Sequence, residues 1–339
     1  MIHARSNPKA GVAYRRFRHA RDCIGPAVGS LGWTLRLTDI RPFAEPLPPN
    51  ASFIRADLAD GPAILRMVEG CGTVLHFGGI SVEQPFEDVY GPNIRGLYHA
   101  FEAARREGAR MVFASSNHTI GFHSRSAVLD GDCAFRPDGY YRLSKVYGEM
   151  MAQLYWDKHG IETVSLRIGS ARAEPTDARM LATWLSYPDL IDLVVRAATA
   201  EKVGHSVVWG ASNNTRMTWW RNDARQMLGW APQDNAEAWA GALEGLVGDQ
   251  PASETNQGGS YCAMGVVART DRADAITLTL FFVQATRTKF GRPRSSMRFR
   301  ARTATATSVA RRLSLRERSL SPITCLKRAT AVSTRARLL

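Results

Sequence analysis

The chain has 339 residues, a length typical of about two domains. Of these residues 45% are hydrophobic, which is enough to fill a sizeable core. No run of about 18 apolar residues occurs, so no membrane partner is expected. The five scattered cysteines form no Cys-x-x-Cys pair, which argues against a disulfide framework or a zinc ribbon and favours a reducing, cytoplasmic location without a metal site. The net charge of +13 lies at the ends: residues 269–339 hold seventeen basic and three acidic residues, whereas residues 23–268 carry about −6. The basic pI therefore does not indicate a nucleic-acid-binding surface on the fold.

The chain begins with a basic segment that precedes the first predicted strand. Residues 1–22 hold six Lys and Arg and one Asp, so we treat residues 1–23 as an atypical basic N-terminus. Such a composition resembles a transit peptide. It is also what a disturbed reading frame in a GC-rich gene produces, because Arg and Ala codons dominate there.

From residue 33 onward, apolar runs alternate with helical patterns. We predict strands at residues 33–40, 51–56, 73–77, 110–114 and 163–168, and helices at residues 61–69, 94–107 and 141–159. Strands separated by helices indicate βαβ units, so the expected fold class is α/β with a doubly wound parallel sheet. We place this domain at residues 24–260, with a small substrate-binding part within about 171–260. In such sheets, ligands bind beyond the carboxyl ends of the strands.

Residues 261–339 follow as a basic tail for which we expect little order, because a stretch rich in Arg, Ser, Thr and Ala cannot bury a core. Its one apolar run, residues 276–285 (ITLTLFFVQA), can form a strand. One interpretation of the tail is non-specific binding of nucleic acid or anionic lipid. The other is again translation in a wrong frame.

Two acidic residues directly follow predicted strands. Asp39 ends the first strand and Asp57 follows the second. An acid at Asp39 can accept hydrogen bonds from both ribose hydroxyls of the adenosine of NAD and repels a 2′-phosphate. Asp57 can similarly receive the adenine amino group. For each, the alternative is an ordinary helix N-cap or turn residue.

A more specific pattern joins Ser116, Tyr141 and Lys145. Tyr141 and Lys145 are four residues apart and therefore share a helix face, where an ammonium beside a phenol lowers the phenol pKa from about 10. This makes Tyr141 a candidate general base for an alcohol proton. Ser116 ends the fourth predicted strand and can donate to the same substrate oxygen. Each feature alone has an ordinary alternative, an exposed helix face or a turn, but the combination is far more specific.

This combination resembles the extended short-chain dehydrogenase/reductase superfamily, the NAD-dependent epimerases and dehydratases. Residues 113–122 (FASSNHTIGF) and 179–184 (RMLATW) resemble its uronate dehydrogenase family, and the likeness covers roughly residues 33–260. The resemblance implies a Rossmann-like fold and NAD-dependent oxidation of the C1 hydroxyl of galacturonate or glucuronate to the aldarolactone. It implies that Tyr141 takes the proton from O1, that Lys145 also binds the nicotinamide ribose, and that Ser116 holds O1.

The resemblance assigns further positions and partners. It implies that Arg179 binds the substrate carboxylate, which suits the two parallel hydrogen bonds of a guanidinium. The other implied substrate contacts are Ser81, Asn117, His118 and Ser170, and the implied cofactor contacts are Gly25, Asp39, Asp57, Leu58, Gly78, Asn93 and Lys145. Asn93 would support a proton relay behind the lysine. Association into a homo-oligomer through helix packing is also implied.

The chain departs from the family at its start. The family opens with a strand and Thr-Gly-x-x-Gly-x-x-Gly, whose backbone approaches the pyrophosphate at a helix N-terminus. This chain has no such run, and residues 14–19 are too charged for a central strand. Gly25 is the candidate for the last glycine, at the start of a helix near residues 24–28, but only 14 residues separate it from Asp39, where about 20 are usual.

We therefore hypothesise that residues 1 to about 23 and those after about 260 come from a disturbed reading frame, and that NAD binding is then impaired. Two other functions stay open. One is another extended short-chain dehydrogenase, such as a nucleotide-sugar epimerase or dehydratase, and the other is a non-catalytic anion-binding protein.

Overall fold

A computed structural model describes residues 20–29, 31–42, 46–48, 50–243, 252–264 and 277–284 of the chain. The strands of its main sheet are β1 (Thr34–Asp39), β2 (Ala51–Arg55), β3 (Thr73–Ile80), β4 (Arg110–Ser116), β5 (Thr163–Ile168), β8 (His205–Gly210) and β9 (Thr277–Gln284). The helices are α2 (Ala20–Gly29), α3 (Gly61–Val68), α4 (Phe86–Val89), α5 (Gly96–Glu107), α6 (Tyr140–His159), α7 (Met180–Thr183), α8 (Tyr187–Thr199), α9 (Ala240–Leu243) and α10 (Ala252–Thr255). There is also one π-helix, η1 (Tyr90–Arg95), within the described residues. The 3-10 helices there are η2 (Asn117–Ile120), η3 (Asp223–Gln226), η4 (Ala236–Trp239) and η5 (Gly259–Ala263). A second, small sheet pairs β6 (Ser170–Ala171) with β7 (Trp184–Leu185).

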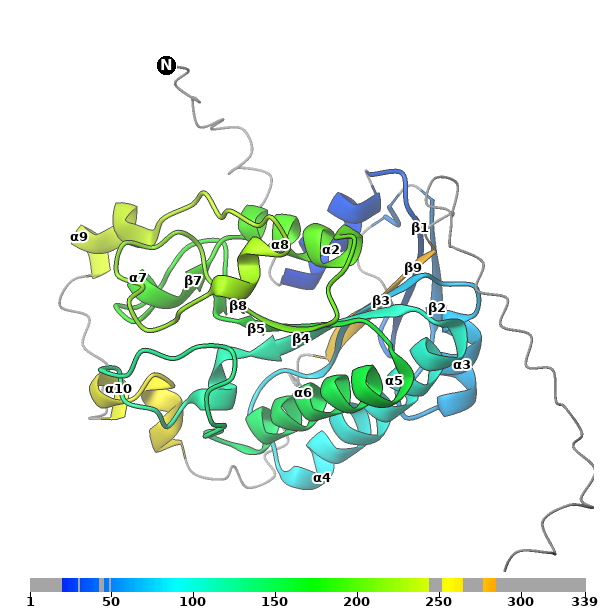
Figure 1. Cartoon of the computed structure of the whole chain (residues 1–339), viewed down its shortest axis with the longest axis horizontal. Helices are drawn as coiled ribbons and strands as arrows, with labels where there is room; N and C mark the ends of the chain where they lie inside the picture. Colours follow the sequence, from blue (N-terminus) through cyan, green and yellow to red (C-terminus); the bar gives the residue numbers. More distant parts are fainter. Residues whose placement is uncertain are drawn as a thin grey trace, which may run out of the picture. The chain divides into compact units, whose positions relative to one another are not determined.

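The main sheet has the strand order β2-β1-β9-β3-β4-β5-β8. Six of these strands share one direction, and β9 runs antiparallel to both of its neighbours. Helices α2 and α8 cover one face, and α3, α5 and α6 cover the other (Figure 1). This arrangement confirms the predicted Rossmann-like α/β fold.

Each face of the sheet has its own apolar core. Leu75 of β3 packs in the cluster that includes Leu193 of α8, and its neighbour Val74 packs in the cluster that includes Phe101 of α5. Successive side chains of a strand point to opposite faces, so a fully buried strand such as β3 feeds both layers. This explains why the predicted strands read as continuous apolar runs rather than as alternating ones.

The predicted elements between residues 33 and 168 are confirmed, with two changes at their ends. Strands β3 and β4 run on to Ile80 and Ser116, beyond the predicted ends. The helix predicted at residues 94–107 continues backwards through the π-turn η1. Pro92 lies within η1, and because proline has no N–H, a wide turn accommodates it where a regular helical bond cannot form. Strand β8 and helix α8 were not predicted.

Helix α6 approaches the sheet closely at Gly148. A Cβ atom at Gly148 would collide with the ring of Phe113 in β4, so the glycine permits this contact. The helix ends at Gly160, whose φ of 62° is the left-handed conformation that favours glycine at a helix C-terminus.

A buried ion pair ties α6 to the strands beneath it. Arg167 of β5 donates to Glu149 of α6 at 2.9 Å, and both side chains are 1% exposed. The hydroxyl of Ser115 donates to the same carboxylate. Buried charges need this degree of hydrogen bonding, so the carboxyl ends of β4 and β5 are held firmly against α6.

Strand β9 lies within the tail for which the sequence predicted little order. Residues 277–284 occupy the centre of the sheet, paired with β1 from Thr34 to Thr38 and with β3 as far as Ile80. Their composition of Thr, Leu, Phe and Val is that of a strand, so the alternative that residues 276–285 form a strand is confirmed. The remaining tail after residue 284 and the basic residues 1–19 lie outside the described residues.

Within the described ranges, no helix is long and apolar enough to cross a membrane, and no cluster of three or more His, Cys, Asp or Glu could hold a metal ion. Three cysteines in these ranges, Cys71, Cys133 and Cys262, have free thiols.

Candidate active site

Three residues predicted to carry the chemistry meet at the carboxyl end of β4. Ser116 is the last residue of β4, and Tyr141 lies in the first turn of α6, close enough for a hydrogen bond with the Ser116 side chain to lower the pKa of Tyr141. The Nζ atom of Lys145 lies 5.5 Å from the centre of the Tyr141 ring. All three side chains are buried. The structure therefore brings the predicted Ser, Tyr and Lys into one site.

The ionisation of this group differs from the sequence prediction. Burial raises the pKa of Tyr141 to about 12, although the charge of Arg142 and the hydrogen bond with Ser116 lower it. Burial also lowers the pKa of Lys145 to about 7. The prediction that a neighbouring ammonium lowers the pKa of Tyr141 below its ordinary value is thus wrong for this structure. The physical reason is that burial destabilises the phenolate more than the nearby positive charges stabilise it.

Asn93 fastens the end of β3 to α6. Its Nδ2 donates to the Ile80 carbonyl and to Ser144 Oγ, both at 2.9 Å, and its Oδ1 accepts the Ile80 N–H at 2.7 Å. Ser144 in turn donates to the Tyr141 carbonyl. A Cβ atom at Gly79, whose φ is 106°, would meet Asn93 Oδ1 at 2.5 Å. Asn93 therefore positions the helix that carries Tyr141; its role in a proton relay stays a prediction.

The predicted carboxylate-binding arginine contacts Asn117, the residue after Ser116. Arg179 donates through Nε to the Gln257 carbonyl at 2.7 Å and through a terminal nitrogen to Thr183 Oγ1 at 3.4 Å. With the Asn117 amide oriented to satisfy its neighbours, its oxygen accepts from Arg179 at 2.6 Å. Ser170 and Thr183 share a hydrogen bond of 2.9 Å. Burial lowers the pKa of Arg179 to about 10, which leaves it charged at neutral pH.

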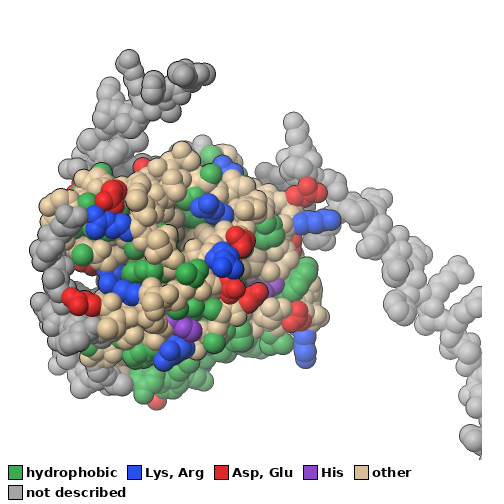
Figure 2. Space-filling view, turned by 60° about the vertical axis from the view of Figure 1, so that its left-hand side comes forward, with side chains coloured by type: hydrophobic (Ala, Val, Ile, Leu, Met, Phe, Trp, Pro, Cys, Tyr) green, Lys and Arg blue, Asp and Glu red, His purple; other side chains and the backbone are tan. Residues whose placement is uncertain are grey.

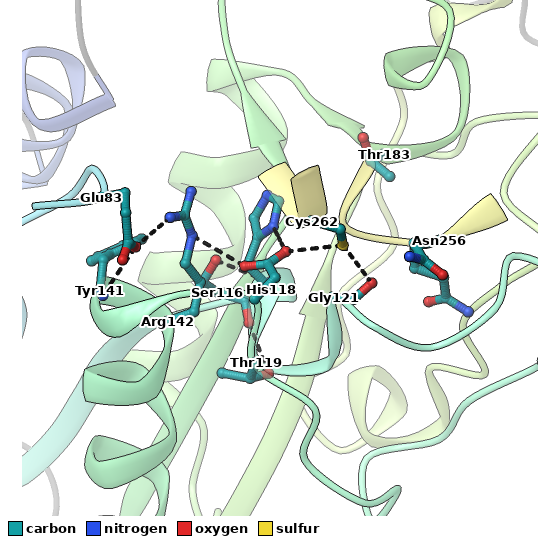
Figure 3. A network of polar contacts seen from close by, with 12 residues as sticks. Glu83, Ser116, His118, Thr119, Gly121, Tyr141, Arg142, Thr183, Asn256 and Cys262 are labelled. Atoms are coloured by element: carbon teal, nitrogen blue, oxygen red, sulfur yellow. Dashed lines mark hydrogen bonds and ion pairs between the residues drawn. The ribbon is translucent and has the colours of Figure 1, made fainter. Parts of the chain in front are cut away.

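A histidine completes this end of the site (Figure 3). His118 Nδ1 lies 2.7 Å from Asp138 Oδ2, and the His118 ring meets the Tyr261 ring edge-on at 4.7 Å. Burial lowers the pKa of His118 to about 4, in spite of the carboxylate. At neutral pH the imidazole is therefore neutral. Because Asp138 only accepts, the proton sits on Nδ1 and Nε2 is left as an acceptor.

The remaining predicted cofactor residues lie at and after the ends of β1 and β2. Asp39 ends β1, and its carboxylate accepts the Arg41 N–H at 2.9 Å. Asp57 accepts the Ala59 N–H at 2.8 Å in a turn after β2, which is the ordinary alternative named for it. Leu58 is buried and packs against Gly96 of α5, where a Cβ would collide with it.

Two of the predicted glycines lie in other elements than expected, and Ser81 lies next to one of them. Gly78 lies within β3 rather than after it, and Ser81 directly follows that strand. The helix expected to start near Ile24 begins at Ala20, so that prediction is wrong and Gly25 lies inside α2 rather than in a loop before it. This placement gives Gly25 no role as a loop glycine.

Sequence reasoning missed the residues that connect these groups. They are Glu83, Asp138, Arg142, Thr183, Gln257 and Tyr261. Most stand in loops or between apolar runs without a motif of their own. The one available signal was the carboxylate of Asp138 just before the predicted helix, where acids are common.

Comparisons with known proteins agree with the fold. Residues 27–216 match the NAD dependent epimerase/dehydratase family, and the chain belongs to this family. It is similar to the uronate dehydrogenase of Pseudomonas putida, at 47% identity over 68% of this chain and 87% of that protein. The uronate dehydrogenase of Pseudomonas syringae is 46% identical over 68% of this chain and 85% of that protein.

Solved structures give the same result. The glucuronic acid dehydrogenase of Chromohalobacter salexigens has a TM-score of 0.70 at 42% identity, over 74% of this chain and 94% of that one. A uronate dehydrogenase variant from Agrobacterium tumefaciens, in complex with NAD, has a TM-score of 0.68 at 42% identity, over 72% of this chain and 92% of that one. A UDP-galactose 4-epimerase at 16% identity and a TM-score of 0.52 shares the fold alone.

Proposed function

We propose that this chain is an NAD-dependent uronate dehydrogenase, which oxidises the C1 hydroxyl of galacturonate or glucuronate to the aldarolactone. The observation that carries the proposal is the meeting of Ser116, Tyr141 and Lys145 in one buried site. It is supported by relatives of that name at 46–50% identity.

The proposed roles follow from the chemistry of each side chain. Ser116 donates to O1 and holds it against the phenol of Tyr141, which takes the O1 proton. When bound, NAD accepts the hydride that leaves C1. Arg179 binds the substrate carboxylate through two parallel hydrogen bonds, and Asn117, which already contacts Arg179, fixes the guanidinium plane. The neutral His118 offers Nε2 as an acceptor for a sugar hydroxyl, and Ser81 and Ser170 supply further hydroxyls.

The residues present fit the two ends of NAD better than its middle. The carboxylate of Asp39 at the end of β1 suits the adenosine ribose, and Lys145 suits the nicotinamide ribose. No glycine-rich run precedes β1 in the sequence, and Gly25 lies within α2. We therefore propose that NAD binds without the usual backbone donors to its pyrophosphate, and that the affinity is reduced accordingly.

The carboxylate requirement gives a direct test. With NAD in large excess, we expect NADH formation at 340 nm with galacturonate or glucuronate and none with galactose. Arg179→Lys keeps the charge but loses the planar pair of N–H donors that binds both carboxylate oxygens, so KM for the uronate should rise about ten- to a hundredfold. Arg172→Lys, at an exposed arginine nearby, is the matched control and should leave KM unchanged. Equal turnover of galactose, or an unchanged KM in Arg179→Lys, would contradict the proposal.

We further propose a homo-oligomer formed through the outer face of α6. Leu143, Met150 and Leu154 of this helix are 46%, 50% and 44% exposed, and their spacing of seven and four residues places them on one face. Tyr98 of α5 is also 46% exposed. Figure 2 shows hydrophobic side chains gathered along the lower edge of the molecule, where Figure 1 places α4 and α6. A helix face of this kind is typical of an interface.

The test of this interface is the molar mass in solution. Met150→Glu should reduce the mass measured by light scattering to that of one chain, because an unpaired carboxylate would be buried between the helices. Val128→Glu, at a position 61% exposed in a loop, should leave the mass unchanged. A wild-type chain that is already monomeric would contradict the proposal.

The organisation of the chain remains a proposal. We assign residues 24–260, together with β9 (Thr277–Gln284), to the catalytic domain, because β9 pairs with β1 and β3 in its sheet. The substrate-binding part lies within about 171–260, and Tyr261 adds a contact because its ring touches His118. The free thiols of Cys71, Cys133 and Cys262 support a cytoplasmic location.

A further inference from the structure

Arg142, the residue after Tyr141, points into the site although its side chain is charged. It is 2% exposed. Its terminal nitrogen donates to Glu83 Oε2 at 2.6 Å, and its Nε lies 3.3 Å from Asp138 Oδ1 (Figure 3). Burying a guanidinium is unfavourable unless carboxylates surround it. Two carboxylates for one buried arginine indicate that this charge has a definite place in the site.

The guanidinium also lies against two aromatic rings. Its central carbon is 5.2 Å from the centre of the Tyr141 ring and 4.5 Å from the centre of the Tyr261 ring. Both distances are within the range of cation–π attraction. Arg142 is therefore a cation held at least as close to the ring of Tyr141 as Lys145, whose Nζ lies 5.5 Å away.

The partner carboxylate of Arg142 fixes the start of α6. Glu83 Oε1 accepts the Tyr140 N–H at 2.6 Å, and Oε2 accepts the Tyr141 N–H at 3.2 Å. These N–H groups have no partner within the helix, so a carboxylate from elsewhere in the chain satisfies them. A Cβ atom at Gly139 would collide with Glu83. Glu83 and Arg142 together thus determine where the backbone of Tyr141 lies.

The second carboxylate connects Arg142 to the substrate side. Asp138 contacts both Arg142 and His118, and His118 meets the ring of Tyr261, which Arg142 also contacts. The charged and titratable groups near Tyr141 are therefore Arg142, Lys145, Glu83, Asp138 and Tyr261. Among the two cations, arginine keeps its charge at every working pH, whereas the buried Lys145 does not.

We propose that Arg142 is a positioning residue of the proposed dehydrogenase. Its permanent charge against the ring of Tyr141 favours the phenolate, and its pairing with Glu83 and Asp138 holds that phenol in place. The inference rests on the proposed function for its catalytic meaning. The effect of Arg142 on the ionisation of Tyr141 is a property of the protein alone and is measured without NAD or substrate.

The test replaces Tyr141 with 3,5-difluorotyrosine, whose phenol ionises at a lower pH, and follows its ¹⁹F signal during a pH titration of the full chain. In Arg142→Gln, the midpoint should rise by about one pH unit, because an opposite charge within about 6 Å has been removed. Arg142→Lys should restore most of the shift. Arg110→Gln is the matched control, since Arg110 pairs with Glu162 at the other end of β4, and its midpoint should stay unchanged.

A second measurement separates positioning from a purely structural role. In the natural-tyrosine chain, Arg142→Gln should lower kcat about tenfold and leave KM for the uronate within about twofold. If this variant does not fold, Arg142→Gln is made in a Glu83→Gln chain, where Glu83 no longer leaves an unpaired carboxylate and the amide oxygen can still accept an N–H of α6. The ¹⁹F midpoint of this double variant is then compared with that of Glu83→Gln alone. A folded variant with an unchanged ¹⁹F midpoint would overturn the proposal. A shifted midpoint in a chain without turnover would instead count against the proposed function alone.

Discussion

Truncation of the chain after residue 276 should abolish cooperative folding, whereas truncation after residue 288 should not. The first truncation removes β9, which is hydrogen-bonded along its length to β1 on one side and β3 on the other. Without it, the β2-β1 pair is separated from the other four strands, and two central strands become open edges. Open apolar edges promote aggregation. The second truncation removes only residues 289–339, and every described strand of the sheet ends before them.

Thermal melts followed by circular dichroism provide the measurement. The 1–288 chain should melt within a few degrees of the full chain, and the 1–276 chain should show no cooperative transition or should precipitate. A point variant gives the same test without deletion. Phe281→Pro, paired with Leu37 and Leu75, removes an N–H from a central strand and should cost about 3 kcal/mol or more, whereas Ser296→Pro should have no effect. Identical melts for 1–276 and 1–288 would show that β9 does not support the sheet.

The position of β9 also explains how the sheet stays continuous although the usual first strand is missing. In dinucleotide-binding sheets of order 3-2-1-4-5-6, the first strand of the chain is central. Here that place is taken by the last described strand. Thr277, the first residue of β9, pairs with Ile80 at the carboxyl end of β3, so β9 starts at that edge of the sheet and runs against its neighbours.

The sequence was sufficient for the parallel part of this fold because each strand there is a local apolar run. The sequence also indicated that residues 276–285 can form a strand, but not which strands they pair with. Pairing with β1 and β3 joins segments about 200–250 residues apart in the chain, and no local pattern specifies such a pairing. The missing glycine-rich start was visible in the sequence, but which segment fills the vacated centre of the sheet required the structure.

The candidate site, too, was only partly predictable from the sequence. Ser116, Tyr141 and Lys145 were found because strand ends and helix spacing place them together. Arg142 was missed because one residue after Tyr141 on a helix normally points elsewhere, and only Glu83 and Asp138 draw its side chain inward. The direction of the pKa of Tyr141 was missed because burial depends on the whole fold.

Tyr141→Phe should lower kcat by about 10²–10⁴-fold with NAD and galacturonate, because it removes the proposed general base. The effect should depend on pH in a defined direction. Burial raises the pKa of Tyr141 to about 12, so below this pH the reactive phenolate increases about tenfold for each pH unit. In the wild-type chain kcat/KM should therefore rise between about pH 7 and 10, whereas the residual rate of the variant should lack this dependence.

The matched control for this prediction is Tyr140→Phe. Tyr140 precedes Tyr141 in the same helical turn, and its ring packs against Phe86 at 5.7 Å, so the substitution deletes a neighbouring hydroxyl outside the proposed chemistry. It should leave kcat and the pH profile unchanged. Retention of more than about a tenth of kcat by Tyr141→Phe would exclude the phenol as the base, since a positioned base contributes at least about a hundredfold. The proton of O1 would then have to leave by another route, and the neutral His118 beside Asp138 is an acceptor that the site offers.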